Sequence, residues 1–126
     1  MLKKIFLFSF GPSIIWCVII VVGSFISSSN VPSIAISDKG IHFYFYAIFA
    51  FLLALPLRLS TKRAYSFVTT SVVVLSIGFC LGVLIELIQH FYVVSRFGEY
   101  FDVLANTIGL VVGLLLCEIL KRKSVL

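Results

Sequence analysis

The chain has 126 residues, of which 61% are hydrophobic and only 12% are charged. Soluble globular domains carry roughly 25% charged residues, so this composition excludes an ordinary soluble domain and indicates a membrane protein. The formal net charge is +5, and in a chain this apolar we assign the basic residues to cytoplasmic loops, not to nucleic-acid binding.

Four apolar segments follow one another along the chain, and at about 20 residues per transmembrane helix they leave no room for a separate soluble domain. The first segment follows Lys3 and Lys4. It is longer than the roughly 7–15 residues of a signal-peptide core, so we expect an uncleaved helix. Pro56 and Arg58 are expected to end the second helix. We predict a single domain, residues 1–126, with helices at about residues 5–26, 41–57, 64–94 and 100–120.

The distribution of basic residues predicts the orientation of these helices. Eight of the ten Lys and Arg residues fall at the two chain ends and in the connector 58–63, whereas Lys39 and Arg96 fall in the other two loops. An excess of Lys and Arg in short loops marks the cytoplasmic side. The predicted fold is therefore an all-α, four-transmembrane-helix bundle in the cell membrane, multi-pass, with both termini in the cytoplasm.

Polar residues mark the outer end of three of the predicted helices. Counting about 20 residues from each cytoplasmic anchor places Asp38, Glu86 and Asp102 at similar depth, near the outer edge of the hydrocarbon. An ionisable residue in or beside a span is a functional hypothesis by default. Helical periodicity predicts one polar stripe on each helix, and we expect the stripes to face one another instead of lipid. The stripes are Asp38, His42 and Tyr46; Glu86, Gln89 and His90; and Asp102 and Asn106.

Glycines predict which helices pack closely. Gly78 and Gly82 lie on one face of the third predicted helix, and Gly109 and Gly113 lie on one face of the fourth. Small residues four apart allow membrane helices to approach closely. We expect the third and fourth helices to meet along these glycines, which would bring the polar stripes of the two helices together. The same glycines could instead form the seam of a homo-oligomer.

Three separated motifs make the sequence similar to a known family. The chain resembles the VanZ-like family of small bacterial membrane proteins over about residues 38–113. The resemblance implies a multi-pass protein with a role in the cell envelope, because the founding member is an accessory protein in resistance to glycopeptide antibiotics, associated with teicoplanin. It implies no established reaction. The motifs are Asp38-Lys39-x-x-His42-Phe43-x-x-Tyr46, Glu86-x-x-Gln89 and Arg96-x5-Asp102-x-x-x-Asn106-x-x-Gly109-x-x-x-Gly113.

The sequence departs from the family pattern at the turn before the last helix. Val94 and Ser95 stand where a Pro-Gly pair is often found, and Glu99 stands where an aspartate is often found. Glu99 keeps the charge, whereas the loss of the Pro-Gly pair changes the backbone preference of the turn.

The acids of the outer cluster outnumber its cations, so they must pair, bind a ligand or take up protons. One hypothesis is structural: Arg96 bridges Asp102 or Glu86 and ties the last two helices together. A second is a binding pocket for a lipid-linked wall precursor, a phospholipid headgroup or the lipoglycopeptide itself, with Lys39 and Arg96 meeting phosphate. A third is an enzyme in which Glu86 or Asp102 acts as general acid or base, His42 shuttles protons, and Arg96 with Lys39 stabilises an anion.

We expect no metal and no cofactor. Asp38 with His42, and Glu86 with His90, each offer only two ligands at i, i+4 spacing, whereas zinc sites need three or four. Whether the protein is an enzyme stays open, and the favoured function is binding of an envelope component that contributes to glycopeptide resistance. The predicted ligand-binding residues are Asp38, Lys39, His42, Tyr46, Glu86, Gln89, Arg96, Asp102 and Asn106.

Overall fold

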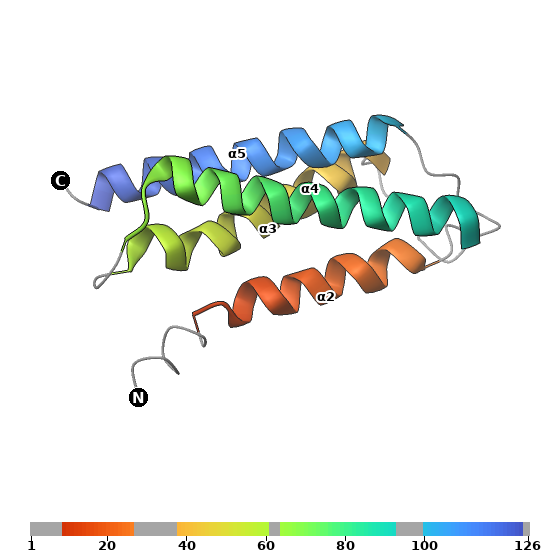
Figure 1. Ribbon diagram of the computed structural model, residues 1–126, viewed down its shortest axis with the longest axis horizontal. Helices are drawn as coiled ribbons and strands as arrows, with labels where there is room; N and C mark the ends of the chain where they lie inside the picture. The colour runs from red at the N-terminus through yellow and green to blue at the C-terminus, as the bar shows by residue number, and fades with distance from the viewer. Residues whose placement is uncertain (1–8, 27–37, 61–63, 93–99, 125–126) are drawn as a thin grey trace.

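The computed structural model describes residues 9–26, 38–60, 64–92 and 100–124. Within these residues the chain is all-helical, as predicted, and successive helices run in opposite directions (Figure 1). Helices α2 and α4 therefore end where α3 and α5 begin, and we call this the Asp38 end; the opposite end is the Arg58 end. The helices are α2 (Gly11–Phe25), α3 (Asp38–Leu59), α4 (Phe67–Tyr92) and α5 (Tyr100–Ser124).

Of the four helices in the described residues, three are long and apolar enough to cross a membrane. Helices α3, α4 and α5 have 22, 26 and 25 residues. Helix α2 has 15 residues, which at 1.5 Å per residue is about 22 Å and falls short of a hydrocarbon core of about 30 Å. The predicted start of the first helix, residues 5–8, lies outside the described residues.

The ends of the helices differ from the predicted ones for local reasons. Helix α3 begins at Asp38, whose carboxylate favours the first turn of a helix, and continues through Pro56 to Leu59. Pro56 and Arg58 were expected to end this helix at about residue 57; the helix passes through Pro56 and ends at Leu59, one residue after Arg58. Helix α4 begins after Ser66, whose hydroxyl accepts a bond from the Thr69 amide at 3.0 Å and so caps the helix.

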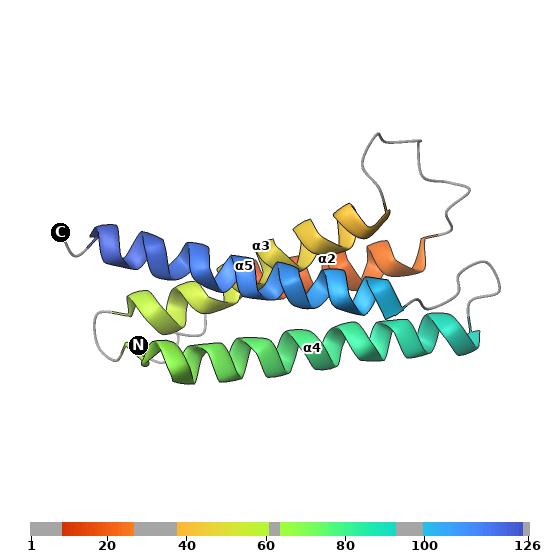
Figure 2. The same ribbon diagram turned by 90° about the horizontal axis from the view of Figure 1, so that it is seen from above.

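Helices α3 and α5 make the closest contact in the bundle, although they are not neighbours in the chain. A Cβ added to Gly109 would lie less than 3 Å from the carbonyl oxygen of Phe43, and one added to Gly113 would lie less than 3 Å from the carbonyl oxygen of Ala47. The two backbones thus touch where α3 crosses α5 obliquely (Figure 2). The α5 glycines therefore pack helices together, but their partner is α3 and not α4 as predicted.

The α4 glycines face side chains of α5 and, at Gly82, also of α3. Gly78 accommodates Leu110, and Gly82 faces the amide of Asn106 and the hydroxyl of Tyr46. Because a leucine side chain fills the space between α4 and α5, their backbones cannot approach as closely as those of α3 and α5. The expected seam of glycines against glycines between α4 and α5 is therefore not formed.

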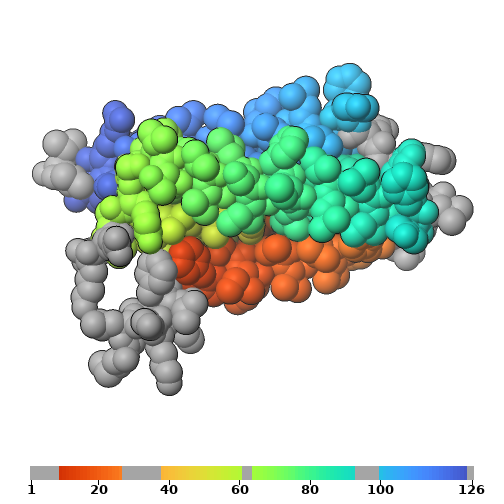
Figure 3. Space-filling model, in the orientation of Figure 1, coloured from red at the N-terminus to blue at the C-terminus, as the bar shows by residue number. Residues whose placement is uncertain are grey.

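Helix α2 covers one side of this arrangement, next to α4 in the space-filling view (Figure 3). The indole nitrogen of Trp16 donates to the carbonyl of Phe45 at 2.9 Å, and the two rings pack edge to face. The outward sides of the helices are apolar, with Ile15, Val68 and Phe91 each more than half exposed. Such a surface suits a lipid environment. The core contains Ile20, Tyr46, Phe49, Ala50, Ala54, Val74, Ile85, Leu110, Leu114 and Cys117.

Candidate functional site

A polar cluster lies inside the bundle at the Asp38 end, and we call it the Asp38 cluster. Five of its seven side chains are at most 6% exposed: Tyr46, Glu86, Gln89, Asp102 and Asn106. Buried polar groups are costly in an apolar surrounding unless other polar groups face them. These five side chains therefore point into the protein and not into lipid. The cluster consists of Asp38, His42, Tyr46, Glu86, Gln89, Asp102 and Asn106.

His42 is the central residue of the cluster. Its Nδ1 lies 3.1 Å from the Asn106 Oδ1, and its Nε2 lies 3.8 Å from the Asp102 Oδ2. Asp38 lies one turn earlier on α3, and ligand atoms of Asp38, His42 and Asp102 all lie within 4.8 Å of one another. One imidazole thus links α3 to two polar residues of α5.

The glycines explain why these side chains can meet. Gly109 lets α5 approach the α3 backbone at Phe43, so His42, the preceding residue, reaches Asn106 three residues before that glycine. Gly82 of α4 leaves room for the Asn106 amide and the Tyr46 hydroxyl, which would lie 3.1 and 3.5 Å from an added Cβ. The glycines therefore allow the side chains of the Asp38 cluster to meet, in addition to allowing the helices to pack closely.

Glu86 and Gln89 complete the buried part of the cluster on α4. Glu86 lies within electrostatic range of the buried Tyr46. The Gln89 amide donates to the backbone carbonyl of Ser24 at 2.6 Å. Helix α2 therefore contributes to the cluster through its backbone, which the sequence did not indicate because α2 carries hardly any polar side chains.

Other predicted residues lie at the rim of the cluster or away from it. Lys39 is exposed, and its Nζ lies 5.9 Å from the centre of the Phe101 ring. His90 is exposed and stacks edge-on against Phe91, so it does not form a joint site with the buried Glu86. Arg96 lies outside the described residues.

The arrangement defines a class of protein: an all-helical membrane protein whose helices enclose carboxylates and an imidazole at one end. The chain matches the VanZ/LLP1 family over residues 5–121 and belongs to that family. No curated protein and no solved structure gives a match. Membership confirms the resemblance that the three motifs indicate.

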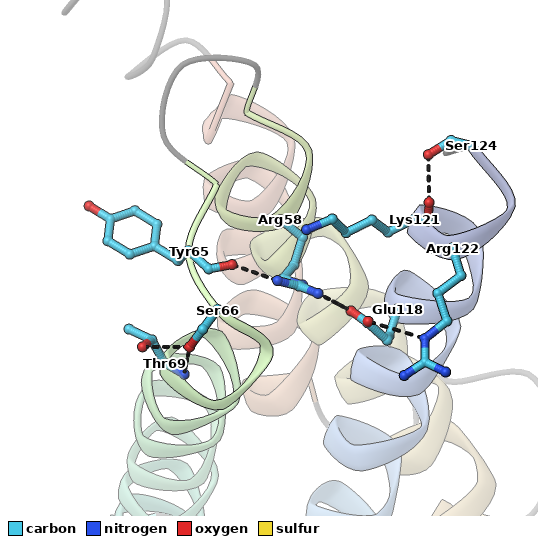
Figure 4. Close-up of polar contacts among 8 residues, drawn as sticks. All are labelled: Arg58, Tyr65, Ser66, Thr69, Glu118, Lys121, Arg122 and Ser124. Carbon is cyan, nitrogen blue, oxygen red and sulfur yellow. Dashed lines mark hydrogen bonds and ion pairs between the residues drawn. The ribbon is translucent and has the colours of Figure 1, made fainter. Parts of the chain in front are cut away.

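A second polar cluster, at the Arg58 end, was not predicted (Figure 4). Arg58 is buried and binds Glu118 through two nitrogens, with its Nε 2.9 Å from the carboxylate. Its Nη1 donates to the carbonyl of Tyr65 at 2.5 Å, and the exposed Arg122 lies 3.4 Å from the other Glu118 oxygen. The pair joins the end of α3 to α5 and holds the start of α4. The sequence feature that could have indicated this ion pair is Glu118, a single acid in an otherwise apolar segment.

Proposed function

We propose that the chain crosses the cell membrane four times, with the Arg58 end and both termini in the cytoplasm. The Arg58 end carries Arg58 and the basic run 121–123, whereas Lys39 is the basic residue of the described helices at the Asp38 end. The antiparallel order of the helices supports termini on the same side of the membrane, since α2 begins and α5 ends at the same end (Figure 1). The Asp38 cluster then lies at the outer side of the membrane.

Labelling of single cysteines tests the orientation. Asn30→Cys is expected to react with an impermeant maleimide in intact cells, and Ser60→Cys is expected to react only after the membrane is opened. A chain lacking Cys17, Cys80 and Cys117 serves as the background. The reverse pattern would place the Asp38 cluster in the cytosol and refute the proposed site of action.

The Asp38 cluster, on this proposal, binds a component of the cell envelope and thereby contributes to resistance against glycopeptide antibiotics of the teicoplanin type. The observation that carries the proposal is the convergence of buried Glu86, Asp102 and Asn106 with His42 at one end of an apolar bundle. Charged groups are rare inside membrane proteins and usually serve a ligand or an ion. Membership of the VanZ/LLP1 family supports the link to the envelope.

The chemistry of the rim suggests the kind of ligand. Lys39 offers an ammonium group, and the tyrosines 44, 92 and 100 are exposed close to the same end. Cations suit phosphate, and aromatic rings suit sugar or acyl surfaces. Ligands of this chemistry are a lipid-linked wall precursor, a phospholipid headgroup and the lipoglycopeptide itself.

Isosteric substitutions test binding against a purely structural role. Glu86→Gln and Asp102→Asn remove charge and keep shape, and His90→Ala is the control because His90 is exposed outside the cluster. We expect normal abundance in the membrane for all three variants and loss of resistance only for the first two. Resistance that survives both isosteric changes would refute a charge-dependent pocket, and loss of abundance would favour the structural hypothesis.

A second candidate function is acid–base catalysis on the same kind of ligand. The observation that favours it is the placement of His42 between Asn106 and the Asp102 carboxylate, since a positioned imidazole can transfer protons. Mass spectrometry of labelled envelope lipids incubated with the purified protein distinguishes the two functions. A stable complex without change in mass supports binding, whereas a product supports catalysis.

A further inference from the structure

We propose that Asp38, His42 and Asp102 bind a divalent transition-metal ion of the Zn²⁺ type at the Asp38 end. The proposal departs from the expectation that the protein holds no metal. The sequence offers Asp38 and His42 as a pair on one helix, and the close approach of α5 adds Asp102 as a third ligand. Their ligand atoms lie within 4.8 Å of one another.

The hydrogen bond to Asn106 fixes which nitrogen of His42 is available. The Asn106 Oδ1 can only accept a hydrogen bond, so the His42 Nδ1, at 3.1 Å, carries the proton and donates it. In a neutral imidazole the Nε2 then keeps its lone pair. A ring nitrogen held in this way by an outer partner is typical of metal-binding histidines.

The Nε2 of His42 faces a carboxylate at a distance that suits a shared ion better than a direct bond. It lies 3.8 Å from the Asp102 Oδ2, and both side chains are little exposed, at 11% and 8%. A cation placed between these two atoms would be bound by both of them.

The donor set indicates the class of ion. One imidazole nitrogen and two carboxylates suit zinc and neighbouring transition metals, whereas Mg²⁺ and Ca²⁺ prefer oxygen alone. With metal–ligand bonds of about 2.0–2.2 Å, two ligands of a tetrahedral ion lie about 3.4 Å apart. His42 and Asp102 are already near this separation, and the exposed Asp38 can close the remaining distance by rotation of its side chain.

Three protein ligands leave a fourth position of the ion open, which is the pattern of catalytic rather than structural zinc sites. Water would occupy that position. The metal site does not depend on the proposed binding of an envelope component, because the metal alone is sufficient to test it.

Titration with Co²⁺ tests the site directly. The full chain is purified in detergent with a tag free of histidine, stripped with EDTA and titrated, and Zn²⁺ is then added as competitor. We expect one Co²⁺ per chain, a d–d spectrum without thiolate charge transfer, and displacement by Zn²⁺. His42→Ala and Asp102→Asn are expected to weaken binding at least tenfold, and Asn106→Ala about 10–100-fold as an outer partner.

Two controls make the result decisive. His90→Ala removes an exposed histidine outside the cluster and is expected to leave binding unchanged. Asp38→Asn alters an exposed residue, so it tests the site even where Asp102→Asn destabilises the bundle, and it is expected to weaken binding at least tenfold. Absence of binding to the wild-type chain, equal binding by His42→Ala and wild type, or a thiolate band from the cysteines would each overturn the proposal.

Discussion

The contact between α3 and α5 leads to a sharp prediction about Gly113. Replacing it by alanine adds one methyl group, and that group would overlap the Ala47 carbonyl and lie 2.9 Å from the Ala50 Cβ. Neither obstacle can rotate away, because one is backbone and the other is a Cβ fixed to backbone. The α3 and α5 backbones must therefore move apart at this point.

The expected cost follows from two opposing effects. Overpacking a close contact costs typically about 1–3 kcal/mol, and separation also loosens the neighbouring contact at Gly109. Alanine favours a helix over glycine by up to about 1 kcal/mol. We expect a net destabilisation of about 1–2 kcal/mol for Gly113→Ala. Gly23→Ala is the matched control, because its added Cβ meets the Phe45 ring at an ordinary 3.7 Å.

Unfolding in mixed micelles of increasing SDS content, followed by circular dichroism, measures both variants. The control is expected to equal the wild type or exceed its free energy of unfolding, and Gly78→Ala is expected to fall between, since it meets a Leu110 side chain. Equal stability of Gly113→Ala and Gly23→Ala would refute the inference that the α3 and α5 backbones touch.

Two further predictions concern the polar contacts that join the helices. Arg58→Met removes the partner that binds Glu118 through two nitrogens and leaves only the exposed Arg122 beside this carboxylate. The expected cost is about 1.5–3 kcal/mol of unfolding free energy, the range for hydrogen bonds to charged groups, and the double variant with Glu118→Leu restores most of it; a double variant as unstable as the single one would contradict this account. Trp16→Phe removes the bond to the Phe45 carbonyl and is expected to cost about 0.6–1.7 kcal/mol in the same assay. An unchanged stability would show that the indole bond does not anchor α2.

The sequence predicted the helical class and the polar faces better than the partners of the helices. Periodicity of 3.6 residues identifies which face of a helix is polar, and Glu86 and Asn106 are indeed buried. Periodicity does not tell which neighbour that face meets. Adjacent helices were expected to pack closest, but the alanines 47, 50 and 54 of α3 form a stripe of small residues that admits the α5 glycines.

The contacts that the sequence did not reveal depend on backbone atoms or on residues far apart in the chain. The Gln89 amide binds the carbonyl of Ser24, and a backbone acceptor leaves no mark in the sequence. The pair Arg58 and Glu118 joins residues that are 60 positions apart. Asp102 likewise joins His42 only through the α3–α5 contact, which explains why the sequence offered Asp38 and His42 as a pair on one helix and gave no reason to expect a metal, whereas the structure brings three candidate ligands together.

The pairing of α3 with α5 has a consequence for how the protein is made. Synthesis proceeds from the N-terminus, so α3 leaves the ribosome well before α5 exists. Until the last helix inserts, His42 lacks both Asn106 and Asp102, and Arg58 lacks Glu118. A nascent or prematurely ended chain therefore exposes unsatisfied polar groups at both ends of the same helix, a defect by which membrane proteases could separate unfinished copies from complete ones.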